Sequence, residues 1–346
     1  MILLAHSTQR IEGLNLVNQL FSFGQMGCQI FFLISGYTIS LSWKRYKEKH
    51  SKLSFLIHRA GGILTGWYLA IFITHLINII LEIKLGKSLG FGQNNEFISI
   101  ICNLLFLNGL LPFCNNNVVA GGWFIGTLII LYILTPTLYE LVKKYNRKVS
   151  LSVIFFIFSL IIAEALNYIF KIDISNNSFY YFNFINQISC YTLGIELYFN
   201  YEDKRFSNKI YLILFVCCFI VSTLIFYFPI FNISYEIVPY IFSVSIYCYI
   251  KTSAYKINIL ESTVIENFGK NTYYIYLVHC FFCYTFPIGI QIFLNKINLV
   301  VEPIIIYIIC LPFMLIFSYY VAIKFKKICI DIQGEIIWKR LMKTKR

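Results

Sequence analysis

The chain has 346 residues, of which 58% are hydrophobic and 13% are charged, and its net charge is +13. Soluble domains carry about 25% charged residues, and disordered chains combine low hydrophobicity with high net charge, so both classes are excluded. One bilayer crossing takes about 20 mostly apolar residues, and the composition therefore predicts an all-α, polytopic transmembrane helix bundle.

The apolar stretches predict about ten spans. The first is only the end of a helix and stops soon after His6, because the chain begins five residues earlier. The segment 98–112 is apolar but about 15 residues long, which suits an interfacial or re-entrant segment better than a crossing. The other nine predicted spans cover residues 27–42, 60–82, 122–142, 149–170, 179–199, 210–228, 234–250, 272–294 and 304–323.

Basic residues predict the orientation of these spans. They lie in short runs between apolar stretches and not in one patch with a motif, which argues against nucleic acid as a partner. With the N-terminus inside, 24 of the 29 Lys and Arg residues fall in cytoplasmic segments, and this favours the orientation strongly. Both termini are then cytoplasmic. The cytoplasmic segments are 44–59, 143–148, 201–209, 251–270 and 324–346.

The predicted domain organisation is simple. Residues 1–330 form one transmembrane domain, whose first helix we expect to be truncated at its N-terminus, and residues 331–346 form a basic cytoplasmic tail. Most of the 11 cysteines, Cys280 and Cys283 among them, lie in apolar runs with no partner cluster of zinc ligands. We interpret them as small packing residues, with redox or metal use as the alternative, and we expect no metal.

Two histidines are candidates for chemistry. His6 ends an apolar run, and His279 lies about 10 Å inside the span 272–294. A histidine at membrane depth is costly unless it faces protein or water, and it titrates near neutral pH, which suits proton transfer. For His6 the alternative is a histidine at a helix end that the interface hydrates. His279 needs a buried partner.

Other polar residues have structural alternatives. Ser35 precedes Gly36 in a segment that resembles ordinary small-residue helix packing. Arg59 offers a fork of donors for phosphate but could equally reach lipid headgroups. Trp123 lies where interfacial tryptophans are common. Two glutamates within predicted spans, Glu164 and Glu196, either pair with polar neighbours or line a cavity.

Several well-known catalytic motifs are missing from the sequence. It contains no Walker loop, GxSxG, HExxH or dinucleotide fingerprint. This argues against an ATP-driven pump and a metalloprotease.

Five motifs follow one another between residues 6 and 279: a helix-borne histidine, G-x-x-x-F-F-x-x-S-G, F-x-x-x-R, W-F-x-x-x-x-x-x-x-Y-x-x-x-P and G-K-x-[ST]-Y-x-x-Y-L-x-H. In this order they resemble the membrane-bound acyltransferase-3 family, the O-acetyltransferases of bacterial cell-surface sugars. The matching residues are His6, Gly27, Phe31, Phe32, Ser35, Gly36, Phe55, Arg59, Trp123, Phe124, Tyr132, Pro136, Gly269, Lys270, Tyr273, Tyr276, Leu277 and His279.

The resemblance implies an integral enzyme of the bacterial inner membrane, in contact with lipid. It would take an acetyl group from acetyl-CoA on the cytoplasmic side and transfer it to a hydroxyl of a cell-surface carbohydrate. His6 would be the catalytic residue. Histidine suits this role, because acyl transfer needs a base or a nucleophile. Substrate and acyl-CoA binding would fall to Arg59, Ser35, Trp123, Tyr276 and His279.

The sequence departs from the family pattern at several positions. An arginine is usual about eleven residues before the histidine, where this chain has no residue. Gly62 replaces a second arginine, Thr65 a proline, and Gln29 an acidic residue or proline.

The alternative function is a polysaccharide transporter or flippase, or a sugar polymerase. A transporter would more often show internal repeats or broken helices.

Overall fold

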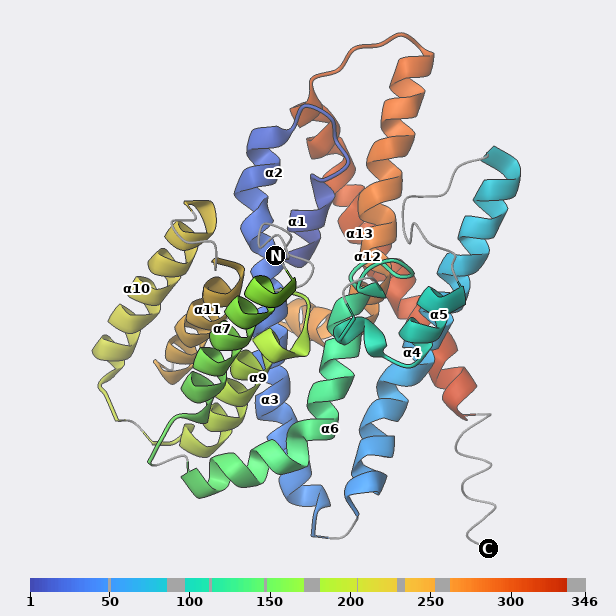
Figure 1. Cartoon of the computed structure of the whole chain (residues 1–346). Helices are drawn as coiled ribbons and strands as arrows, with labels where there is room; N and C mark the ends of the chain where they lie inside the picture. The colour runs from blue at the N-terminus through green and yellow to red at the C-terminus, as the bar shows by residue number, and fades with distance from the viewer. Residues whose placement is uncertain are drawn as a thin grey trace, which may run out of the picture.

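The structure, a computed structural model, describes residues 1–48, 51–85, 97–111, 114–145, 148–170, 181–203, 205–228, 234–252 and 262–334. These residues form helices and connecting segments, with no strand among them (Figure 1). The helices are α1 (Ile2–Ser7), α2 (Asn15–Ser22), η1 (Phe23–Met26), α3 (Gly27–Tyr46), α4 (Lys52–Leu85), α5 (Phe97–Leu104), η2 (Leu107–Gly109), α6 (Gly122–Tyr145), α7 (Leu151–Phe170), α9 (Phe184–Asn200), α10 (Asn208–Tyr227), α11 (Ser234–Lys251), α12 (Thr263–Lys296) and α13 (Pro303–Gln333).

The described part of the chain contains five helices that are long and apolar enough to cross a membrane, namely α4, α6, α10, α12 and α13. Their surroundings differ. α10 lies at the edge of the bundle and buries only 11% of its most apolar window, as expected for a lipid-facing helix, whereas α6 lies inside and buries 61% (Figure 1). The all-helical membrane class is therefore confirmed. The total of about ten spans and the cytoplasmic termini stay predictions.

Several predicted helix bounds were too short. α4 begins at Lys52 instead of residue 60, α12 begins at Thr263 instead of residue 272, and α13 extends to Gln333 instead of residue 323. At 1.5 Å per residue, the 34 residues of α12 span about 51 Å, well beyond the roughly 30 Å of a bilayer core. Hydropathy predicts only the apolar stretch of a helix, whereas the helix itself ends where its backbone is capped. For α12 the N-terminal cap is Ser262.

The stretch between His6 and residue 27, where the sequence predicts no span, is partly helical. Residues 15–26 form α2 and η1. The apolar pattern that predicts spans does not mark these helices, because they are too short to cross a bilayer. The short apolar segment near residue 100 behaves as expected, since α5 has only eight residues. Its continuation packs against α6, where the Asn108 amide donates a hydrogen bond of 2.6 Å to the Gly122 carbonyl.

The centre of the fold is α9, which packs against α3, α6, α7 and α11. Gly36 on α3 and Gly194 on α9 allow the closest approach, because a Cβ on either would overlap a backbone carbonyl of the other helix. The short helix α1 contacts α12, α13 and η1, with the N-terminus near the middle of the bundle (Figure 1). This placement brings His6 to the inner face of α12.

Candidate active site

His6 is half-buried on α1, and its ring is held by two polar side chains. Its Nδ1 atom lies 3.1 Å from Gln9 Oε1 and 3.2 Å from the Tyr284 hydroxyl, which itself donates to Gln9 Oε1 at 2.8 Å. An amide oxygen only accepts hydrogen bonds, so Nδ1 carries the hydrogen and Nε2 keeps its lone pair. The His6 ring is thus oriented as a base at Nε2.

His279 on α12 faces His6 from the other side. Its side chain is 2% exposed, and its Nδ1 atom donates to the Tyr276 carbonyl at 2.6 Å, which again leaves Nε2 with the lone pair. The centroids of the His6 and His279 rings are 5.3 Å apart, with a 50° angle between the ring planes. The sequence predicted that His279 needs a buried partner. In the structure its partners are the Tyr276 carbonyl and the His6 ring.

A polar cavity of about 310 Å³ opens on the His6 side. Amide, hydroxyl and guanidinium groups from segments far apart in sequence line it, together with aromatic rings. Trp123, 4% exposed, stacks on Phe182 with ring centroids 4.8 Å apart and planes 27° apart. The polar side chains of the lining are His6, Gln9, Arg10, Gln25, Asn116, Tyr181, Tyr276 and Tyr284.

A second, mostly apolar cavity of about 410 Å³ opens on the His279 side, between α1, α3 and α12. It extends along α12 from Ile265 to His279. The two cavities share Ile2 and Tyr276 in their linings. Tyr276 is fixed there because its hydroxyl donates to the Gly121 carbonyl at 2.7 Å. The histidine pair therefore lies between an apolar and a polar cavity.

Arg59 and Ser35 belong to a different group of residues. Both are half-buried. Ser35 is a hydrogen-bond partner of the Tyr132 hydroxyl on α6, and Arg59 lies within electrostatic range of the same hydroxyl. Neither is among the described residues that line the two cavities. The structure thus brings together His6, His279, Tyr276 and Trp123, and it places Arg59 with Ser35 and Tyr132.

The two glutamates have different surroundings. Glu196 on α9 is 5% exposed and accepts hydrogen bonds from the Ser152 backbone at 2.9 Å and from the Ser150 and Ser152 hydroxyls. It therefore caps the N-terminus of α7, where backbone N–H groups lack helical partners. Glu164 is exposed on α7. Neither glutamate lines the cavities beside the histidines, as far as the described residues show.

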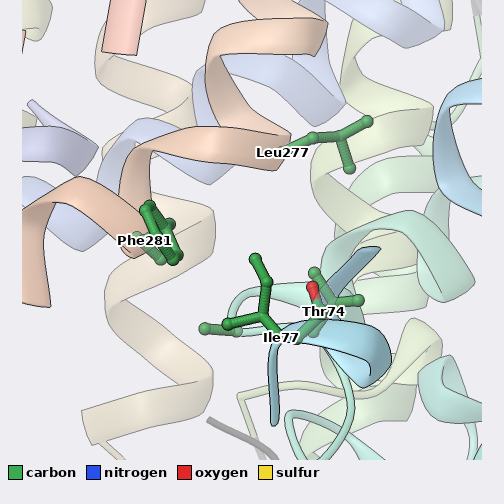
Figure 2. Close-up of a pocket in the computed structure, with 7 residues that line it drawn as sticks. Thr74, Ile77, Leu277 and Phe281 are labelled. Carbon is green, nitrogen blue, oxygen red and sulfur yellow. The ribbon is translucent and has the colours of Figure 1, made fainter. Parts of the chain in front are cut away.

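A third, much smaller cavity lies between α4 and α12 (Figure 2). Thr74 and Ile77 of α4 face Leu277 and Phe281 of α12 across it, and Cys280 also lines it. Its volume of about 30 Å³ has room for water-sized molecules and none for a substrate.

Sequence reasoning missed several residues of this site. Gln9 lies three residues after His6, a spacing that puts two side chains on one helix face, and could have been found. Tyr284, Tyr181 and Asn116 carry no comparable pattern. Cys280 was interpreted as a packing residue, yet its thiol lies 3.4 Å from His279 Nε2, and ligand atoms of His6, His279 and Cys280 all lie within 4.8 Å of one another.

Comparison with known proteins assigns the chain to a family. Residues 1–323 match the family model described as an acyltransferase domain. No curated protein matches the chain, and no solved structure does. The matched range covers both histidines, the two cavities beside them and all five candidate spanning helices up to the last turns of α13. The chain is a multi-pass membrane protein that belongs to the acyltransferase-3 family.

Proposed function

We propose that this membrane acyltransferase moves an acetyl group from acetyl-CoA to a hydroxyl of a cell-surface carbohydrate, in the bacterial inner membrane. One observation carries the proposal: His6 and His279 lie between an apolar and a polar cavity. A transferase needs two substrates to meet at one base, and this arrangement provides a place for each.

The proposed reaction uses the lone pair on His6 Nε2. The acceptor hydroxyl gives its proton to Nε2 while its oxygen attacks the thioester carbonyl carbon. The carbon–sulfur bond breaks, and the CoA sulfur leaves and takes up the proton from Nε2. Gln9 and Tyr284 hold the ring at Nδ1, and a hydrogen bond to Nδ1–H stabilises the imidazolium between the two proton transfers.

The donor is proposed to bind through two groups of residues. The guanidinium of Arg59 is a fork of donors that matches phosphate oxygens of CoA, and it lies within electrostatic range of Tyr132. The cavity along α12 is proposed to hold the arm that carries the thioester, because this cavity ends at His279. The charge distribution predicts that Arg59 and the N-terminal end of α12 lie on the cytoplasmic side, where CoA is found.

The acceptor is proposed to bind in the polar cavity. Sugar hydroxyls both donate and accept hydrogen bonds, and the amides of Gln9, Gln25 and Asn116 can do the same. The stacked rings of Trp123 and Phe182 offer an apolar surface for the C–H face of a sugar. A transporter of polysaccharide intermediates, the alternative function, receives no support from the family assignment.

The test is to compare O-acetyl groups on the surface glycans of cells with and without the gene. Wild type should restore alkali-labile acetyl groups to the deletion strain. His6→Gln keeps the size of the side chain but cannot act as a base near neutral pH, and it should lower acetylation by about 10²–10⁴-fold at equal abundance in the membrane. Unchanged acetylation after deletion of the gene would reject the proposal.

A further inference from the structure

We propose that His6, His279 and Cys280 form a zinc-binding site, and that Zn²⁺ bound there blocks acyl transfer. The binding part stands on geometry alone, whereas the inhibition part rests on the proposed function. Ligand atoms of the three residues lie within 4.8 Å of one another. Two imidazole nitrogens and one thiolate are a donor set that favours zinc over Mg²⁺ or Ca²⁺, which prefer oxygen ligands.

Both imidazoles are already arranged as metal ligands usually are. A histidine that binds a metal through one ring nitrogen commonly donates the other N–H to an oxygen acceptor, which fixes the tautomer and the ring orientation. His279 Nδ1 donates to the Tyr276 carbonyl, and His6 Nδ1 donates to Gln9 Oε1. The two Nε2 atoms therefore keep the lone pairs that a metal needs.

Cys280 completes the donor set despite an unfavourable spacing. Successive side chains on a helix diverge by about 100° and rarely reach one ion. Here the thiol of Cys280 lies 3.4 Å from His279 Nε2, so both atoms reach the same point. Zinc bonds of about 2.0–2.3 Å set ligand atoms in a tetrahedron roughly 3.3–3.8 Å apart. To bind one ion, ligand atoms that now lie within 4.8 Å of one another would have to move closer by about 1 Å.

The surroundings leave room for an ion to arrive and for a fourth ligand. His6 lines the polar cavity of about 310 Å³, through which a hydrated ion can approach. Three protein ligands leave one tetrahedral position for water, an arrangement known from zinc sites with an open position. Cys280 also borders the small cavity between α4 and α12 (Figure 2), which leaves space for the thiol to turn.

Zinc at this site would inhibit the proposed reaction for a direct reason. The metal would occupy the lone pair on His6 Nε2, the same lone pair that is proposed to accept the proton of the acceptor hydroxyl. Cys280 has no part in that chemistry. Cys280→Ser should therefore raise the Zn²⁺ concentration that is needed to inhibit the activity the variant shows without zinc.

The first experiment measures binding without any activity assay. Purified protein in detergent is titrated with Co²⁺, which gives a sulfur-to-metal charge-transfer absorption when a thiolate coordinates it. Wild type should show the band at about one equivalent and lose it to added Zn²⁺. Cys280→Ser should lack the band and bind Zn²⁺ at least about tenfold more weakly. The matched control is Cys283→Ser, since Cys283 is buried on the same helix but contacts the Leu3 carbonyl.

The outcomes separate the two parts of the proposal. Absence of the band in wild type, or a band that survives Cys280→Ser, overturns the zinc site. If Cys280→Ser does not elute as a folded species, His279→Gln serves as the second variant, and a band that survives this substitution also overturns the site. In the acetylation assay, half-maximal inhibition by Zn²⁺ should need at least about tenfold more metal in Cys280→Ser than in Cys283→Ser. Equal sensitivity of the two variants to Zn²⁺ rejects the proposed inhibition. Zinc binding itself is then accepted or rejected by the Co²⁺ titration alone.

Discussion

Gly194 on α9 lies directly against the Leu33 carbonyl of α3, so that a Cβ at this position would overlap the carbonyl oxygen. We expect Gly194→Ala to lower the free energy of unfolding by about 1–3 kcal/mol, because two packed helices must move apart. The measurement is the melting temperature in detergent. The control is Gly289→Ala on α12, where an added Cβ meets nothing within 4 Å. Equal stability of the two variants would show that the contact between α3 and α9 is not tight.

The two histidines should differ in their effect on acetylation. His6→Gln should abolish it, and His279→Gln should cause a partial loss, because we assign the proton transfer to His6 and a supporting position to His279. Both variants should insert at normal abundance, which a blot of the membrane fraction checks. Near-normal activity in His6→Gln together with loss in His279→Gln would mean that the two roles are reversed.

The Tyr284 hydroxyl should position His6 through Gln9. Tyr284→Phe keeps the ring and removes this hydroxyl, and it should lower the rate by about two- to tenfold, the net worth of one hydrogen bond. The KM for acetyl-CoA should stay unchanged, because the apolar cavity is untouched. Tyr320→Phe on the exposed face of α13 is the control. A rise in KM with no change in rate would contradict a positioning role.

Arg59 should bind phosphate groups of acetyl-CoA. Arg59→Lys keeps the charge but loses the fork of donors, and it should raise the KM for acetyl-CoA about tenfold with little change in kcat. The control is Arg45→Lys, the same chemical change at an exposed position near the end of α3. If both variants keep the wild-type KM, Arg59 has only the lipid contact that its position also allows.

The charge distribution predicts the topology. Reporter fusions after residues 47, 145, 205, 258 and 340 should report the cytoplasm, and fusions after 90, 175 and 297 should report the outside. A cytoplasmic signal at 175 would contradict the map from the fourth span onward. The positions 90, 175, 258 and 340 lie outside the described residues, so that only the fusions test them.

The sequence by itself determined the class of the protein and the order of its helices. Apolar composition, span length and basic runs are local properties, and they indicated an all-helical membrane protein with a short segment near residue 100, which α5 confirms. The motif order from His6 to His279 also indicated the acyltransferase-3 family, which the family match confirms. Helix ends were less accurate, because α4, α12 and α13 continue beyond the apolar stretches that predicted the spans.

Only the tertiary structure decided which residues meet. His6 and His279 are separated by 273 positions in sequence, and their contact depends on how α1 packs against α12. The same packing adds Tyr284 and Cys280, which no local pattern distinguishes from other buried residues of α12. The sequence left open whether Glu196 pairs with polar neighbours or lines a cavity, and its hydrogen bonds to Ser152 place it at the N-terminus of α7. Hydropathy and spacing describe one segment at a time, whereas a site depends on the side chains that several packed helices bring within a few ångströms.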